Sequence, residues 1–240
     1  DPGGALARVE FHFYSDDLPH IQKHPRHRVI GRSSPHYAPA LQRFGGILHC
    51  GSTTAFNAGY WAIEAFPFSQ VSFFACDMTY DGEQSHFYGQ GQPDPLRRDI
   101  SLQNLAAKGL RLFWMGLEHQ ALFLNASAEP HSRLLLPRLA SGISLAGALP
   151  TGREQAMGEV RERLRPLAEA ALARERQAPC DGLRHDYWRL QSDPAVWDHA
   201  RACDALWMAL EPEVRAFGSW LAERIEPSAA GHPTAAAPGD

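Results

Sequence analysis

The stretch that decides the fold is GGILHCGSTTAFNAGYWAIEAFPFSQVSFFACDMTYDGEQSHFYG, residues 45–89. Its pattern predicts a strand over 46–50, a tight turn, a buried helix over about 54–66 and a second apolar strand over 71–76. Strand, helix and strand in this order form a βαβ unit with parallel strands. Ligands of open parallel sheets bind beyond the carboxyl ends of the strands, so we expect the functional site where these two strands end.

Further strands and one helix surround this unit. Alternation of apolar and polar residues predicts an N-terminal strand over 9–17, and a short strand is expected over 28–31. An apolar stripe predicts a helix over about 99–118, with Asp99 as its start signal, and a strand follows over 121–127. These elements predict an α/β fold with a Rossmann-like parallel sheet flanked by helices.

The composition changes near residue 150, where charged residues become frequent. A charged amphipathic helix begins there, and Pro166 in its middle predicts a break. Apolar residues at helical spacing predict further helix over 193–226. We therefore expect three parts, which are a Rossmann-like nucleotide-sugar-binding domain over 1–145, a helical extension over 146–226 and a disordered tail over 227–240.

Composition excludes several classes of protein. The net charge of −4 on 240 residues argues against capture of nucleic acid by bulk electrostatics. No apolar run is long enough to span a bilayer and no signal peptide is visible, so we expect a cytoplasmic protein and leave peripheral membrane association open. The four cysteines have no CxxC or metal-ligand spacing, so we expect thiols in a reducing compartment and no metal site.

Polar side chains follow both strands of the βαβ unit. Ser52, Thr53 and Thr54 lie at the start of the predicted helix, where backbone amides and hydroxyls can bind a phosphate; plain capping of the helix is the alternative. Asp77 follows the second strand, where its carboxylate suits a sugar or ribose hydroxyl or a metal ion. A carboxylate that caps the following turn is the alternative for this residue.

The loop after Asp77 contains His86, with Tyr80 and Tyr88 on either side of it. Imidazole transfers protons near neutral pH, and phenolic hydroxyls donate hydrogen bonds to phosphates and sugars. This loop is therefore a candidate for acid–base catalysis. An aromatic plug with a structural histidine is the alternative interpretation.

Six short segments follow one another between residues 45 and 139, and they are GSTTA, VSFFACD, HFYG, NLAAKGL, LFLNAS and SRLLLPR. This ordered set resembles bacterial CMP-sugar-dependent sialyltransferases and their relatives, which include the MptE-like pterin pyrophosphokinases and Rossmann-type enzymes of surface-polysaccharide synthesis. The resemblance implies a Rossmann-like fold with a nucleotide-sugar site. It places Ser52 and Thr53 near the nucleotide, Asp77 after the central strand, Tyr80 or Tyr88 near the phosphate, and His86 as the base on the acceptor hydroxyl.

The leading hypothesis is a glycosyltransferase that uses a CMP-activated acidic sugar, of the sialic acid or Kdo type, in bacterial surface-glycan synthesis. It requires no cofactor, and its partners are the nucleotide sugar and a glycan acceptor. One alternative is a pterin or nucleotide pyrophosphokinase-like enzyme that holds Mg²⁺ through Asp77, Asp81 or Asp94. The other is a non-catalytic Rossmann-like module that binds a partner through the helices over 151–226.

Two departures from the family pattern favour the non-catalytic module. The sialyltransferases have a second histidine four residues after the first, and this chain has Gln90 there. They also open with a Gly-Asn-Gly-Pro-Ser-like turn, which is not found near Val9. Since the sequence begins at Asp1 rather than Met, two explanations stay open. Either the start of the chain is missing, or this protein has lost the turn that usually binds the nucleotide. The C-terminal helices are candidates for acceptor binding or for a homo-oligomer.

Overall fold

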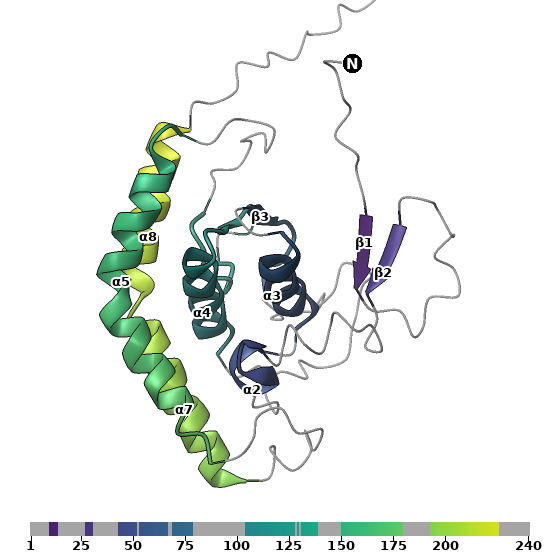
Figure 1. Ribbon diagram of the computed structural model, residues 1–240, viewed down its shortest axis with the longest axis vertical. Coiled ribbons are helices and arrows are strands. Elements are labelled where there is room, and N and C mark those ends of the chain that lie inside the picture. Colours follow the sequence, from purple (N-terminus) through teal and green to yellow (C-terminus); the bar gives the residue numbers. More distant parts are fainter. Residues whose placement is uncertain are drawn as a thin grey trace, which may run out of the picture.

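The computed structural model contains helices joined to two small parallel sheets, in the α/β class (Figure 1). The helices account for most of the described chain. The structure describes the backbone of 10–13 and 27–30, and residues 43–51, 53–66, 69–78, 104–127, 129, 131–138, 150–179 and 193–225. The expected tail over 227–240 and the start signal Asp99 lie outside these ranges.

Two pairs of parallel strands replace the single sheet expected from the sequence. Strand β1 (Glu10–Phe13) pairs with β2 (His27–Ile30), where both N-terminal strands are expected. Strand β3 (Gln70–Phe73) pairs with β4 (Leu122–Asn125), in a register that sets Val71 opposite Phe123. No strand of the described residues joins the two pairs. The described residues therefore show parallel pairing but not a complete Rossmann-like sheet.

Strand β3 is shorter and more exposed than the expected strand over 71–76. All four residues of β4 are buried, whereas only Phe73 is fully buried in β3. Phe74 is 54% exposed, and Ala75 has a φ of 51°, which leaves the extended region and ends the strand. Among the described residues β4 is the only strand that pairs with β3.

Residues 46–50 form a helix and not the expected strand. Helix α2 (Gly46–Cys50) starts after Gly45, with a φ of 93°, and ends at Gly51, with a φ of 81°. Glycine adopts these left-handed angles without strain, so the pair bounds a single tight helical segment. A five-residue apolar run fits a buried helical turn as well as a buried strand, which is why the sequence pattern misassigned it. The βαβ unit of the described residues therefore runs from β3 to β4.

Helices α3 (Thr54–Ala65) and α4 (Leu105–Glu118) lie side by side. Helix α3 has the expected bounds, and the Thr53 hydroxyl accepts a hydrogen bond from the amide of Phe56 at 3.2 Å. Helix α4 starts later than expected, because Asn104 caps it by accepting from the amide of Ala107 at 3.1 Å. Helix α4 is buried along nearly its whole length, and it connects the small β3–β4 sheet with the C-terminal helices.

Three C-terminal helices lie where the helical extension is expected, and the first two of them pack directly on α4. The third contacts α4 through the rings of Phe217 and Phe113. Helix α5 (Arg153–Glu175) runs alongside α7 (Pro194–Met208) and α8 (Glu211–Arg224), which follow each other along its length (Figure 1). The predicted break at Pro166 is wrong, since α5 continues through it. Pro166 is exposed, and buried residues on both sides of it keep the helix packed. None of the described helices is both long and apolar enough to cross a membrane.

Candidate functional site

Three of the seven predicted site residues belong to the described chain, and they are Thr53, Thr54 and Asp77. The other four, Ser52, Tyr80, His86 and Tyr88, lie outside the described residues. Thr53 caps helix α3 with its hydroxyl, which is the alternative that the sequence left open for this turn. The turn follows helix α2 and not a strand, so it does not lie at the strand end where we expected it.

Asp77 lies just beyond β3 and meets the segment that follows β4. Its carboxylate accepts a hydrogen bond from the hydroxyl of Ser127, which stands two residues after β4. Asn125, the last residue of β4, donates from its side chain to Ser132 Oγ at 3.1 Å and to the Leu134 carbonyl at 2.9 Å. The carboxyl ends of both strands therefore meet in one polar group.

Arg138 adds a positive charge to this group. Its Nη2 donates to the carbonyl of Ser127 at 2.9 Å and also to the carbonyl of Glu129. Partial burial raises the pKa of Asp77, the Glu129 carboxylate raises it further, and Arg138 opposes the shift. We call Asp77, Asn125, Ser127, Glu129, Ser132 and Arg138 the strand-end cluster.

A second polar group lies inside the protein, where α4 meets the C-terminal helices. Arg111 and Lys108 on α4 are each only 1% exposed. Arg111 makes a bidentate ion pair with Glu175 of α5, with N···O distances of 2.7 and 2.9 Å. Lys108 binds Asp204 of α7 at 2.9 Å and the carbonyl of Leu48 at 2.9 Å. Each buried cation thus has a carboxylate partner on a different helix.

The environment of Glu175 keeps it charged. Burial favours the neutral acid, but the charge and hydrogen bonds of Arg111 hold the pKa of Glu175 at about 2. The indole of Trp207 donates a further hydrogen bond to Oε1 at 2.7 Å. Arg111 itself also donates to the Tyr60 hydroxyl at 2.7 Å and to the Phe44 carbonyl at 2.6 Å. This network fixes the Glu175 carboxylate in place.

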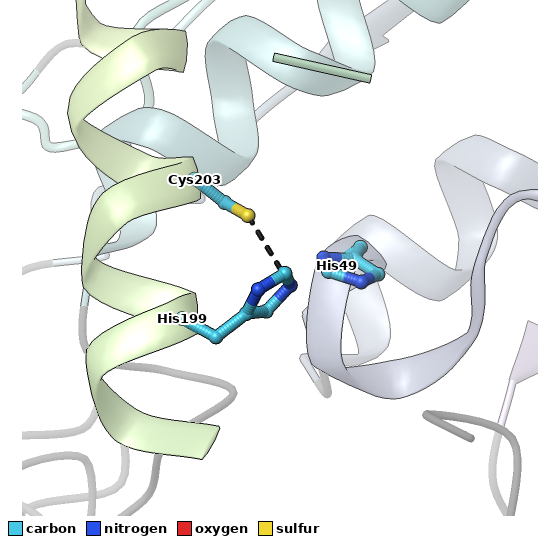
Figure 2. A group of neighbouring side chains, drawn as sticks. All are labelled: His49, His199 and Cys203. Carbon is cyan, nitrogen blue, oxygen red and sulfur yellow. Dashed lines mark hydrogen bonds between the residues drawn. The ribbon is translucent and has the colours of Figure 1, made fainter. Parts of the chain in front are cut away.

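Next to Glu175 lie two histidines and a cysteine, which we call the His–His–Cys group. His199 and Cys203 project from one face of α7 toward His49 on α2 (Figure 2). The candidate ligand atoms of the three side chains all lie within 4.8 Å of one another. The exposed fractions of these residues are only 5%, 3% and 1%, for His49, His199 and Cys203.

Burial sets the protonation of this group. It lowers the pKa of His49 to about 3, although Glu175 opposes the shift, and it also lowers the pKa of His199. Both imidazoles are therefore neutral near pH 7. Burial raises the pKa of the Cys203 thiol to about 11, so the thiol keeps its proton in the absence of a bound ion.

The sequence contains one signal for this group that we missed. His199 and Cys203 are four residues apart, a spacing that places two side chains on the same face of a helix. The third member, His49, was missed because residues 46–50 were assigned to a strand. His199 and Cys203 lie 150 or more positions after His49 in the sequence, so no local pattern joins the three residues.

The two groups are suited to different chemistry. The strand-end cluster offers a carboxylate, hydroxyls and a guanidinium for a polar or anionic ligand. The His–His–Cys group offers two neutral imidazoles and a thiol, which are ligands of transition metals.

Comparison with known proteins found no relative. No protein-family model, curated protein or solved structure matches this chain.

Proposed function

We propose that this protein is a glycosyltransferase that uses a CMP-activated acidic sugar, of the sialic acid or Kdo type, and binds it at the strand-end cluster. The observation that supports the proposal is the meeting of three segments of the ordered motif set. Asp77 ends VSFFACD, Ser127 ends LFLNAS and Arg138 ends SRLLLPR, and the three are joined by hydrogen bonds at one sheet edge. Ligands of α/β proteins bind at such an edge.

Each residue of the proposed site has a chemical role. Asp77 accepts hydrogen bonds from hydroxyls of the sugar or ribose, and Arg138 provides positive charge close to the leaving CMP phosphate. His86 takes the proton of the acceptor hydroxyl as the new glycosidic bond forms and the bond from the anomeric carbon to the phosphate breaks. Tyr80 and Tyr88, which follow Asp77 closely in the chain, donate hydrogen bonds from their phenolic hydroxyls to the phosphate.

Titration calorimetry with CMP and CDP tests the proposal on the full chain. We expect wild-type protein to bind CMP, and Asp77→Asn to weaken binding about tenfold because one charge-assisted hydrogen bond is lost. The matched control is Asp198→Asn, because Asp198 is an exposed aspartate on α7 that pairs with Arg201. Its CMP affinity should equal that of the wild type. Absence of CMP and CDP binding by the wild-type chain would refute the proposal.

A pyrophosphokinase-like enzyme is the second candidate, and one observation favours it. Asp77 and Glu129 both contact the Ser127 hydroxyl, Asp77 through its carboxylate and Glu129 through its backbone amide, and carboxylates are the ligands that Mg²⁺ prefers. The same calorimetry with ATP, with and without MgCl₂, separates the two candidates. Binding of ATP only in the presence of Mg²⁺ supports the kinase. If the chain binds neither CMP nor Mg·ATP, both enzyme hypotheses fail and the non-catalytic binding module is favoured.

A further inference from the structure

We propose that His49, His199 and Cys203 form a binding site for a transition-metal ion, with Zn²⁺ as the ion that suits them best. This proposal is independent of the glycosyltransferase, because it concerns the interface of α2 and α7 and no residue of the strand-end cluster. It departs from the sequence-based expectation that the chain holds no metal. Three features support it, which are the ligand distances, the neighbouring carboxylate and the local charge.

The distances within the group are close to those of a metal site. Cys203 Sγ lies 3.4 Å from His199 Nε2. In a tetrahedral zinc site with Zn–N of about 2.0 Å and Zn–S of about 2.3 Å, the N and S ligands are about 3.5 Å apart. The two side chains from α7 are thus already at ligand spacing. The candidate ligand atom of His49 lies within 4.8 Å of both, so this side chain has to move by up to about 1.5 Å to reach ligand spacing.

The Glu175 carboxylate supports His49 as a ligand. Its Oε1 lies 3.8 Å from His49 Nδ1 and is fixed by Arg111 and Trp207. Metal-binding histidines commonly donate a hydrogen bond to a carboxylate from the nitrogen that does not bind the metal. The separation of 3.8 Å is longer than such a bond, so the His49 ring has to approach Glu175 as the ion binds. Nδ1 would then donate to Glu175, and Nε2 would keep its lone pair for the ion.

The charges around the group cancel in part. Lys108 is paired with Asp204, and Arg111 with Glu175, while the charge of Arg174 also reaches His199 and Cys203. A thiolate at Cys203 supplies the negative charge that offsets this third cation. On binding, the Cys203 thiol loses its proton to solvent and the thiolate sulfur bonds to the metal. One thiolate with two imidazoles favours Zn²⁺ over Mg²⁺ or Ca²⁺, which prefer oxygen ligands.

The group supplies three ligands of a tetrahedral set. Among the described residues, no fourth histidine, cysteine or carboxylate joins it within ligand distance. Three protein ligands with one free position are typical of zinc sites that hold a water molecule or a substrate. The ion would also tie α2 to α7, so its binding should stabilise the folded chain.

Cobalt titration of the full, metal-free chain tests the site. Co²⁺ bound by a thiolate in tetrahedral geometry gives a charge-transfer band in the near ultraviolet and d–d bands in the visible. We expect one Co²⁺ per wild-type chain with both signals, displaced by one equivalent of Zn²⁺. Cys203→Ser should abolish the charge-transfer band. The matched control is Cys76→Ser, which removes a free cysteine outside the group and should leave the band unchanged.

A second variant makes the test independent of how Cys203→Ser folds. His49→Gln keeps the thiol but removes one imidazole, and should weaken Co²⁺ binding by more than about tenfold while far-UV circular dichroism stays as in the wild type. The proposal is overturned if wild-type protein binds no Co²⁺. It is equally overturned if folded Cys203→Ser keeps the charge-transfer band, or if folded His49→Gln binds Co²⁺ as tightly as the wild type.

Discussion

Replacing Glu175 by glutamine should cost more stability than any other Glu→Gln change on α5 or α8. The substitution keeps the shape of the side chain but removes the negative charge that pairs with buried Arg111. It also turns an NH₂ group toward donors on Arg111 and Trp207, which now have one acceptor fewer. Removal of one partner from a buried ion pair typically costs about 3–5 kcal/mol.

The pKa of Glu175 gives a second measure of the same effect. A pKa lowered from 4.5 to about 2 corresponds to about 3 kcal/mol of stability. Because the folded-state pKa is the lower one, this stability is fully present above pH 4.5 and is lost as the pH falls toward 2. We therefore expect the free energy of unfolding of wild-type protein to fall with acid over this window. Glu175→Gln should have a flatter profile there.

Urea unfolding in the presence of EDTA, followed by circular dichroism, measures both quantities without interference from a bound metal. The matched control is Glu213→Gln on α8, whose partner Arg163 on α5 is exposed and lies at 2.8 Å. An exposed pair contributes less than about 1 kcal/mol, so the control should change little. If Glu175→Gln lost no more stability than Glu213→Gln, the assignment of a strong buried pair would be refuted.

Two further substitutions test the packing of the helices. Pro166→Ala should raise the free energy of unfolding by about 1–3 kcal/mol in urea melts. Alanine has the backbone N–H that proline lacks, and it restores the hydrogen bond to the Glu162 carbonyl in an unbroken helix. A lower stability of this variant would contradict this account of α5. Gly116→Ala should destabilise by about 1–3 kcal/mol, since its Cβ would lie 2.5 Å from a ring carbon of Phe123. The control is Gly158→Ala, whose added Cβ would have no atom within 4 Å, and it should stabilise the protein by up to about 1 kcal/mol. Equal effects of the two substitutions would disprove the close contact between Gly116 and Phe123.

The helices were predictable because their signals are local. Apolar stripes and capping residues such as Thr53 lie within one or two turns of the sequence, so α3, α7 and α8 appear where the pattern puts them. The start of α4 was placed too early because Asp99 and Asn104 are both good capping residues, and the sequence does not distinguish them. The run over 46–50 was too short to separate helix from strand.

The sites were only partly predictable, because their contacts join distant segments. Asp77 could be placed at the end of a strand, but its hydrogen bond to Ser127 depends on how β3 and β4 pair. Lys108 and Arg111 would be expected on an exposed helix face from their charge alone. Their partners, Asp204 and Glu175, belong to helices that no local pattern links to α4.

The two buried ion pairs also govern how the C-terminal helices can dock. Apolar helices can slide along one another by a turn, about 5.4 Å, and still bury similar surfaces. Here the same shift would leave two cations and two carboxylates inside the protein without partners. The two ion pairs therefore fix the register of α5 and α7 along α4. In a fragment cut near residue 150, water would solvate the two cations, but the apolar residues of α4 that pack on α5 and α7 would be exposed. We therefore expect the parts over 1–145 and 146–226 to fold together.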